Sequence, residues 1–586
     1  MGSVVRAPRA PRTFRSFSAL LALSLTAVAG CQAAAVDPAD LVLHHGRIVT
    51  VDPALPEAQA LAVRGGTILA IGSDAEIAAY IGEATEVIDL AGRLAVPGLI
   101  EGHGHYMSLG ESLTQLDVRF AADWAEILDM VAAAVAEAAP GEWIVGRGWH
   151  QDKWQRPPEP NVEGLPVHQG LSEVSPDNPV MLEHTSGHGV FANARALEMV
   201  GIDRGTPDPP GGEIVRDAAG EPIGMLRETA SGPVEAAFGR RLADAPAADR
   251  EREQRRWVHL AAENALANGI TSFQDMGSSF ETLDLLRAMA DEGNLPVRLY
   301  MAIQEPAEQM ADRLAGYRMV GYGDGFLTVR AIGEKVLDGA LGTHGGWLLE
   351  PYADLPRSVG FNVTPVEEIR ASAALAVEHD YQMAIQGIGD RAVRELFDIY
   401  ETAFASDPSK TDLRWRIEHA QVIHPDEVPR FAASGIIAGI QGVFACSDGI
   451  WVHERLGGER TQERGYIYRT LIDAGAAIMN GTDPPVELID PIASFHCSVA
   501  RELPDGTLFL PEQAMTREQA LKSYTIDNAY AAFEDDIKGS LTPGKVADIT
   551  VLSRDIMTIP IDEIPSTEVV YTIVGGEVRY RAGGSE

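Results

Sequence analysis

Histidine and aspartate side chains suited to holding a metal ion follow several short apolar runs of this chain. In VPGLIEGHGHYM, His103 and His105 are two residues apart. On an extended backbone such side chains point to the same side, so two imidazoles can occupy two positions around one cation. His419 closes RWRIEHA, and Asp483 follows the apolar run of AIMNGTDPPV, where two prolines must end the strand. Taken alone, His419 could be a core histidine and Asp483 a turn aspartate.

A charged residue within another apolar run adds to this pattern. Lys335 lies in AIGEKVLDGALG, where an uncompensated buried ammonium would be costly. We therefore expect a neighbour to neutralise Lys335 or the chemistry to use it. In a βα barrel the strand ends converge on one catalytic face, so these residues together predict a metal centre.

The elements that would position these residues alternate between strand-like runs and amphipathic helical stretches such as WAEILDMVAAAVAEAA and PVEEIRASAALAVEHD. This alternation predicts an α/β fold with a parallel sheet. Runs that end in polar residues near positions 100, 183, 273, 335, 386, 418, 441 and 480 are compatible with an eight-stranded barrel.

The same sequence patterns predict the domains. The barrel spans residues 98–536, and the Pro- and Gly-rich stretch 120–250 within it is too long for one βα loop, so it predicts an inserted subdomain. Short β-branched runs separated by glycine pairs occupy 41–97 and 537–583. These two ends predict one composite β-sandwich domain.

The first thirty residues are typical of a secretory signal peptide. Four arginines precede an apolar segment, and LTAVAGC resembles a bacterial lipobox, which implies cleavage before Cys31 and lipid attachment to its sulfur. Residues 31–40 would then be a tether, and Gln32 favours the outer membrane on the periplasmic side. An ordinary cleaved signal with a coincidental cysteine is the alternative.

Charge and cysteine content exclude some classes of partner. The formal net charge is −38, so nucleic acid and anionic membrane surfaces would be repelled, and membrane contact is expected only through the lipid anchor. The expected partner is a small-molecule substrate, and a homodimer is plausible. Besides Cys31 the chain holds only Cys446 and Cys497, which makes a disulfide framework unexpected although one bridge is possible.

Ten motifs in one order resemble the amidohydrolase superfamily, in particular its amidohydrolase-3 group of exoenzyme-like and N-substituted formamide deformylase-like proteins. They run from PGLIEGHGHYM through GRGWHQDKW, HTSGHGVFANARAL, GGEIVRDAAGEPIGML, GITSFQDMG, KVLDGALG, GIGDRAV, RIEHAQ and GTDPPV to GSLTPGKVADITVL. The resemblance implies a distorted (β/α)8 TIM barrel with a β-sandwich formed by both ends.

The resemblance also implies a ligand set. His103 and His105 match the first metal pair, His419 and Asp483 match later ligands, and Lys335 matches a lysine that CO2 converts to a metal-bridging carbamate. Gln386 stands where relatives usually have histidine, and its amide oxygen is a poorer donor for zinc than imidazole. We therefore expect one or two divalent ions, with zinc favoured over manganese or iron.

The implied chemistry is hydrolysis of an amide-type C–N bond, with a metal-activated water and Asp483 as general base. His188 in HTSGHGVFAN either faces the substrate, where it could stabilise an oxyanion, or is structural. Trp149 either lines the substrate pocket or packs among the aromatic residues of the inserted subdomain, and we expect His344 to contact the substrate. Alternatives are an ester, carbamate or lactone hydrolase, or a lipid-anchored binding protein that has lost turnover. Retention of Lys335, His419 and Asp483 argues against the binding protein, because binding alone needs no general base.

Overall fold

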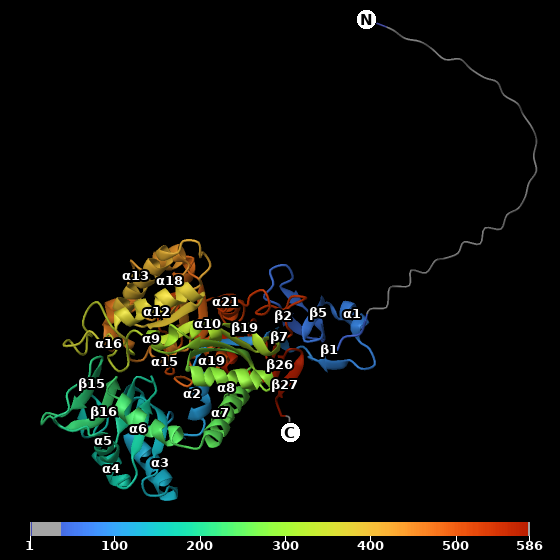
Figure 1. Ribbon diagram of the computed structural model, residues 1–586. Coiled ribbons are helices and arrows are strands. Elements are labelled where there is room, and N and C mark those ends of the chain that lie inside the picture. Colours follow the sequence, from blue (N-terminus) through green and yellow to red (C-terminus); the bar gives the residue numbers. More distant parts are fainter. Residues whose placement is uncertain (1, 3–36, 584–586) are drawn as a thin grey trace, which may run out of the picture. The chain divides into compact units, whose positions relative to one another are not determined.

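The computed structural model describes Gly2 and residues 37–583 of the chain (Figure 1). The predicted signal peptide and the lipidation of Cys31 therefore lie outside the described residues. Within the described part, none of the helices combines the length and apolar character needed to span a membrane.

A parallel barrel forms the centre of the fold. Most of its strand residues are buried, as expected for parallel strands with helices packed outside. The outer helices include α7 (Ala247–Ala267), α8 (Phe280–Asp291), α12 (Val366–His379) and α13 (Asp390–Ser406). The sheet runs through eight strands in spatial order, namely β8 (Leu99–Gly104), β17 (Ile270–Ser278), β18 (Arg298–Ile303), β20 (Leu327–Val336), β21 (Gln382–Gly387), β22 (Arg416–His419), β23 (Ile437–Gln441) and β24 (Ile478–Gly481).

The first and last strands of the barrel are joined by a side chain. Asn528, on α21 (Ile526–Ala531), donates hydrogen bonds of 2.7 Å to the carbonyl oxygens of Ile100 on β8 and Asn480 on β24. Its own Oδ1 accepts from the Asn480 backbone N–H at 2.9 Å. The nearly closed barrel is thereby tied together at its seam.

The expected eight-stranded barrel is confirmed, with one strand exchanged. The run near 183 belongs to β13 (Val180–His184), which lies in a different sheet. The missing barrel strand is β18 (Arg298–Ile303). Both segments are short and apolar, so periodicity alone does not say which sheet either one joins.

A separate sheet with its own helices is inserted between β8 and β17. Its strand order is β15-β16-β14-β13-β10-β9, with β9 (Leu116–Asp117), β10 (Ile144–Trp149), β14 (Gly189–Ala192), β15 (Gly212–Arg216) and β16 (Pro222–Glu228) around β13. Helices α3 (Trp124–Glu137), α4 (Gln169–Val174), α5 (Ala194–Val200) and α6 (Gly232–Ala243) accompany it, and Figure 1 shows them as a cyan to green group. Trp149, Leu182 and Phe191 belong to its hydrophobic core.

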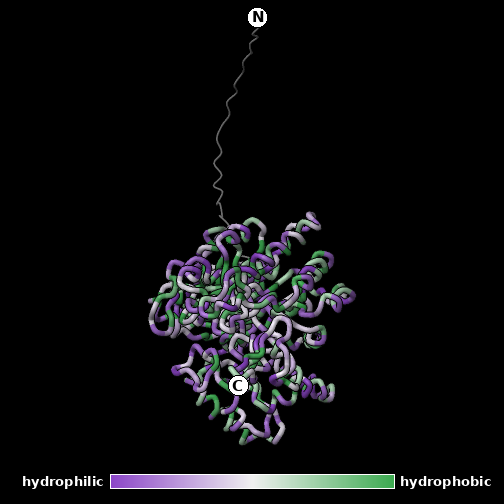
Figure 2. The backbone as a smooth tube through the Cα atoms, turned by 90° about the vertical axis from the view of Figure 1, so that its left-hand side faces the viewer, coloured by the Kyte–Doolittle hydropathy of each residue, from purple (hydrophilic) through white to green (hydrophobic). Residues whose placement is uncertain are grey.

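Two further sheets contain the strands nearest the ends of the described chain, and the second joins both ends, so that blue and red strands lie together in Figure 1. The first has the order β5-β4-β1-β6, with β1 (Leu41–His44), β4 (Ala60–Arg64), β5 (Thr67–Gly72) and β6 (Glu86–Asp89). The second has the order β27-β26-β25-β7-β2-β3, with β2 (Arg47–Val49), β3 (Glu57–Ala58), β7 (Leu94–Pro97), β25 (Ile549–Leu552), β26 (Val569–Val574) and β27 (Glu577–Arg581). Apolar residues from both sheets, among them Leu43, Val63 and Val551, form one core. Figure 2 shows that short hydrophilic and hydrophobic stretches alternate along the backbone of the described chain.

A disulfide joins Cys446 and Cys497, whose Cα atoms are 6.0 Å apart. It connects α15 (Phe444–Ser447), which follows barrel strand β23, to α19 (Pro491–Ala500), which follows β24. The one bridge that the cysteine count allowed is therefore formed.

Candidate metal centre

Five polar side chains meet where barrel strands end. His103 lies on β8 and His105 directly follows that strand. Glu334 lies on β20, His419 ends β22, and Asp483 follows β24. His105 Nε2 is 3.3 Å from Asp483 Oδ1, and His419 Nε2 is 3.3 Å from Glu334 Oε1. His103 Nε2 lies between the two pairs, 3.6 Å from Asp483 Oδ1 and 3.7 Å from Glu334 Oε2.

These spacings fit ligands of a divalent cation. Two ligand atoms that are each about 2.0–2.1 Å from zinc at a tetrahedral angle lie about 3.3–3.4 Å apart. His103 Nε2, Glu334 Oε1 and Asp483 Oδ1 are buried and have no hydrogen-bond partner. Leaving several such atoms unpaired is costly, and a cation among them would satisfy all three. Two groups of possible ligands overlap at His103: one with Glu334 and His419, the other with His105 and Asp483.

Neighbouring residues orient the two most buried histidines. His103 Nδ1 is 2.8 Å from Glu418 Oε2, and His419 Nδ1 is 2.9 Å from Gln441 Oε1. Because a carboxylate or amide oxygen can only accept, each Nδ1 carries the proton and each Nε2 lone pair faces the cluster. Such partners fix the imidazole tautomer and raise its basicity as a ligand.

A buried carboxyl positions the loop that carries Asp483. Glu101 accepts hydrogen bonds from the backbone N–H and the hydroxyl of Thr482, both at 2.7 Å. Asp483 itself adopts φ +58° and donates its backbone N–H to the His103 carbonyl at 2.9 Å. A non-glycine residue in this left-handed region is uncommon and occurs often at functional sites.

The electrostatics of the cluster keep Asp483 ionised. Burial raises the pKa of Asp483, but His103 and His105 outweigh burial and bring the pKa to about 2. Burial lowers the pKa of His103, while Glu334, Asp483 and Glu418 raise it, with a net increase. The surroundings therefore attract positive charge.

Lys335 does not join this cluster, contrary to the expectation of a metal-bridging carbamate. Its Nζ donates to the Glu305 carbonyl oxygen at 2.9 Å and lies 2.6 Å from Glu368 Oε1. The preceding residue, Glu334, faces the histidines instead. The buried ammonium is thus neutralised by Glu368, the simpler of the two outcomes considered for Lys335, and Glu334 brings a carboxylate to the place expected for the carbamate.

Gln386 and His188 meet at the edge of the site. Gln386 Nε2 donates to the Asp338 carbonyl oxygen and lies 3.3 Å from His188 Nε2. His188 Nδ1 is 2.7 Å from Glu228 Oε2. Burial lowers the pKa of His188, but the Glu228 charge outweighs it and raises the pKa to about 9, which favours the imidazolium at neutral pH.

A cavity of about 420 Å³ opens above the cluster. Four of the five cluster residues line it, and only the fully buried His103 does not. The rest of the lining includes Gln386 and residues of the inserted sheet and nearby loops, among them Arg147, His150, Lys153, His188, Glu228, Phe444, Asp448 and Trp451. A volume of this size suits a small-molecule ligand.

Trp149 and His344, expected to contact substrate, lie elsewhere. Trp149 is fully buried, donates its Nε1–H to the Leu182 carbonyl and packs against Trp154 and Phe191 in the inserted core. His344 Nε2 is 3.1 Å from Asp354 Oδ2. Neither lines the cavity, whereas His150, next to Trp149 in sequence, does.

Several functional residues escaped sequence reasoning. Glu334 adjoins Lys335 in the same apolar run, and Glu418 adjoins His419, so either member of each pair could have faced the site. Gln441 is the last residue of its strand, as His419 is of the preceding strand, and this position is a signal that could have identified an orienting residue. Glu228 pairs with a histidine forty positions away, and no local pattern marks it.

Comparison with known proteins shows the family that this chain resembles. Residues 86–580 match the amidohydrolase family. The chain is 32% identical to the protein LONG AFTER FAR-RED 3 of Arabidopsis thaliana over 561 residues, covering 92% of each chain. It is 28% identical to the N-substituted formamide deformylase of Arthrobacter pascens over 563 residues, covering 93% of this chain and 99% of that protein.

Among solved structures, the chain resembles an uncharacterized metal-dependent hydrolase from Pyrococcus horikoshii OT3. The TM-score is 0.69 at 25% sequence identity, and the match covers 89% of this chain and 99% of the other.

Proposed function

This chain belongs to the amidohydrolase family, and from that premise we propose that it is a metal-dependent hydrolase that cleaves an amide-type C–N bond of a small molecule. N-acyl amines, N-formyl amines and cyclic amides are the substrate classes. The name of the Arthrobacter relative, an N-substituted formamide deformylase, supports this choice of bond.

One observation carries the proposal. Buried ligand atoms of His103, Glu334 and Asp483 face one another without partners, and the cluster to which they belong forms the floor of a cavity of about 420 Å³. Unpaired buried atoms of this kind are rare in folded proteins unless an ion or ligand completes them.

The residues that would hold a divalent cation are His103, His105, Glu334, His419 and Asp483. A cation bound there supplies a water of lowered pKa and polarises the substrate carbonyl. Asp483, kept ionised by its neighbours, takes the proton from the attacking water as general base. It then delivers that proton to the leaving nitrogen, so the amine departs neutral.

His188 would stabilise the oxygen that becomes negative during attack. Its Nδ1 is fixed by Glu228, so the other ring nitrogen is directed toward the neighbouring Gln386 at the edge of the cavity. A preoriented cationic donor in a buried site can lower the barrier substantially.

The metal content follows from the same residues. Glu334 and Asp483 provide two negative charges, which balance one divalent ion, and the three imidazoles favour zinc over harder cations such as manganese. A second ion would need the amide oxygen of Gln386, and the overlap of the two ligand groups at His103 leaves limited room for it. We propose one tightly held zinc ion, with any second ion bound weakly.

We further propose that the protein is exported and anchored through a lipid on Cys31. The lipobox-like LTAVAGC supports the anchor. The Cys446–Cys497 disulfide supports an oxidising compartment, because such bonds persist mainly outside the cytosol.

The test compares the mature wild-type chain with Asp483→Asn. Hydrolysis of a panel of N-substituted formamides, other amides, and matched esters is measured after elemental analysis of both proteins. We expect wild type to release amine, and the variant to lose roughly 10²–10⁴-fold in kcat while metal is still bound.

Asp448→Asn is the matched control. Asp448 lines the same cavity and accepts from the Tyr466 hydroxyl at 2.7 Å, but it lies outside the cluster. We expect less than about a tenfold change in kcat from this variant. Esters turned over in preference to amides would shift the assignment to an esterase, and equal turnover by wild type and Asp483→Asn would refute the proposed general base.

A further inference from the structure

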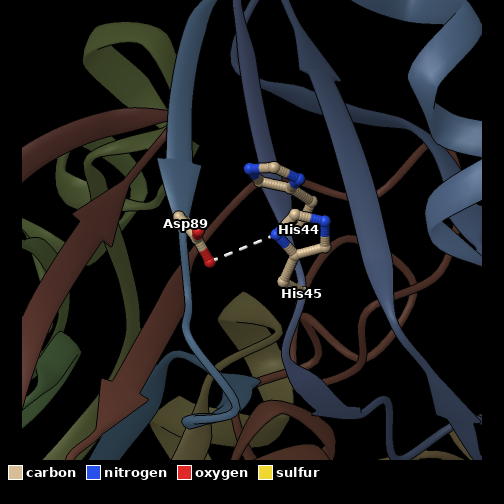
Figure 3. A group of neighbouring side chains, drawn as sticks. All are labelled: His44, His45 and Asp89. Carbon is tan, nitrogen blue, oxygen red and sulfur yellow. Dashed lines mark ion pairs between the residues drawn. The ribbon is translucent and has the colours of Figure 1, made fainter.

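Two histidines and an aspartate meet on the surface of the sheet β5-β4-β1-β6, apart from the barrel cluster. His44 ends β1, His45 follows it, and Asp89 ends the neighbouring strand β6. Figure 3 shows the two imidazoles side by side with the Asp89 carboxylate turned toward them. His45 and Asp89 are well exposed, with 54% and 59% of their side-chain surfaces accessible.

Backbone structure holds the three residues in this arrangement. His44 and Asp89 are directly paired in the parallel register of β1 and β6. Consecutive residues of a regular strand point to opposite faces, but His45 adopts φ +54°, and its ring comes within 3.9 Å of the His44 ring, centroid to centroid. The His45 backbone N–H donates to Asp74 Oδ1 at 2.8 Å, and the His45 carbonyl accepts from Gly92.

The spacing of the polar atoms matches that of the barrel cluster. His45 Nδ1 is 3.4 Å from Asp89 Oδ1, close to the 3.3 Å that separates His105 Nε2 from Asp483 Oδ1. One ligand atom from each of the three surface residues lies within 4.8 Å of the others. The 3.4 Å between His45 Nδ1 and Asp89 Oδ1 suits two ligands of a tetrahedral ion.

We propose that His44, His45 and Asp89 form a second, solvent-accessible site for a borderline transition-metal ion such as Zn²⁺, Ni²⁺ or Cu²⁺. Two imidazoles and one carboxylate are a donor set that these ions prefer over Ca²⁺ or Mg²⁺. Water fills the remaining coordination positions, because the group is exposed. The site shares no residue with the barrel cluster and does not depend on the proposed hydrolase function.

A plain ion pair is the competing explanation, and the chain contains one for comparison. His424 Nδ1 is 3.5 Å from Asp426 Oδ2 on the surface, but this pair is not among the groups of three possible ligands found in the described residues. If spacing between one histidine and one aspartate were sufficient, both surface pairs would bind metal. The proposal requires the second imidazole, and it therefore predicts metal binding only at the His44–His45–Asp89 group.

The experiment titrates metal-free mature protein with Ni²⁺ and, separately, Zn²⁺ by calorimetry, and also tests retention on a Ni²⁺-charged column without an affinity tag. The variants are His45→Ala, Asp89→Asn and the control His424→Ala, all with the barrel cluster intact. We expect His45→Ala to remove one binding event per chain, or weaken it about tenfold or more, and to elute earlier. Asp89→Asn weakens the same event, and His424→Ala leaves it unchanged.

Amide hydrolysis is measured on the same samples after loading with one equivalent of zinc. Unchanged turnover in His45→Ala, together with the lost binding event, assigns that event to the surface site and not to the barrel. The proposal is overturned if wild type and His45→Ala give the same isotherms, or if His424→Ala loses as much binding as His45→Ala.

Discussion

Glu334 and Asp483 supply the two negative charges of the barrel cluster, and an oxygen of each is buried without a partner. Two buried carboxylates in one cluster are stable only when positive charge lies between them. The charge of Glu334 is therefore expected to govern how tightly a cation is held, while Lys335, which pairs with Glu368, is expected to have no direct effect.

Replacement of Glu334 by Gln keeps the shape and removes one charge. We expect the zinc affinity of Glu334→Gln to fall about 10–100-fold and the hydrolysis rate to fall with it. Affinity is measured by competition with a chelating dye.

Lys335→Met is the matched comparison one residue away. It should retain zinc at the wild-type ratio, and added bicarbonate should change neither protein. Loss of metal in Lys335→Met, together with metal binding by wild type that increases with bicarbonate and unchanged metal affinity in Glu334→Gln, would restore the carbamate and contradict the geometry.

His188 gives a prediction on pH. Because Glu228 raises the pKa of His188 to about 9, the imidazolium persists until pH exceeds that value. In Glu228→Gln burial lowers the pKa of His188, and only the smaller effects of the Glu334 and Asp338 charges oppose it. The alkaline fall of kcat/KM should then begin at least about one pH unit lower than in wild type. Identical alkaline limbs would show that charged His188 does not take part.

At the scale of elements, the barrel depends on a side chain to close its seam. Asn528 is fully buried and makes three hydrogen bonds to the backbone of β8 and β24. His103 lies on β8 and Asp483 follows β24, so the seam also sets the distance between these two cluster residues.

Asn528→Ala should lower the free energy of unfolding by about 2–4 kcal/mol, because three buried backbone groups lose their partners. Urea unfolding followed by intrinsic fluorescence measures the change. The control is Asn268→Ala, whose side chain donates only to the Asn264 carbonyl at 2.9 Å, and about 1 kcal/mol or less is expected there. Equal losses in the two variants would mean that the seam is not held by Asn528.

The sequence predicted the elements better than their assembly. Apolar runs closed by His103, His419 and Asp483 were identifiable because strand composition and polar termini are local features. The assignment of β13 instead of β18 to the barrel was wrong, because pairing partners are chosen by the tertiary fold. At residue level, the sequence could not show which of the adjacent residues Glu334 and Lys335 faces the site, because side chains of an irregular strand do not alternate strictly between its two faces.

For the whole molecule, the Cys446–Cys497 bridge is the one covalent link between distant segments of the described chain. It closes a loop with a sequence separation of 51, for which chain entropy predicts about 4 kcal/mol at most. It also ties α15, whose Phe444 lies 6.2 Å from the His419 ring, to the body of the fold.

Reduction of the disulfide should therefore lower the midpoint of thermal unfolding of the wild type to that of the Cys446→Ser/Cys497→Ser double variant. The midpoint of the double variant itself should not change when reductant is added. We expect a loss of about 2–4 kcal/mol in stability. Calorimetry with and without a thiol reductant measures both proteins. A reductant effect of equal size in the double variant would show that the bridge is not its cause.

The sheet shared by both chain ends imposes an order on biosynthesis. Strand β7 pairs with β25, yet roughly 450 residues separate them in the chain, which a ribosome needs roughly 20–90 s to add. During that time β7 presents an unpaired, apolar edge, the kind of surface that aggregates or recruits chaperones. Completion of this sheet thus waits for the synthesis of β25, and a nascent chain that stalls before residue 549 cannot finish the sheet with which it began.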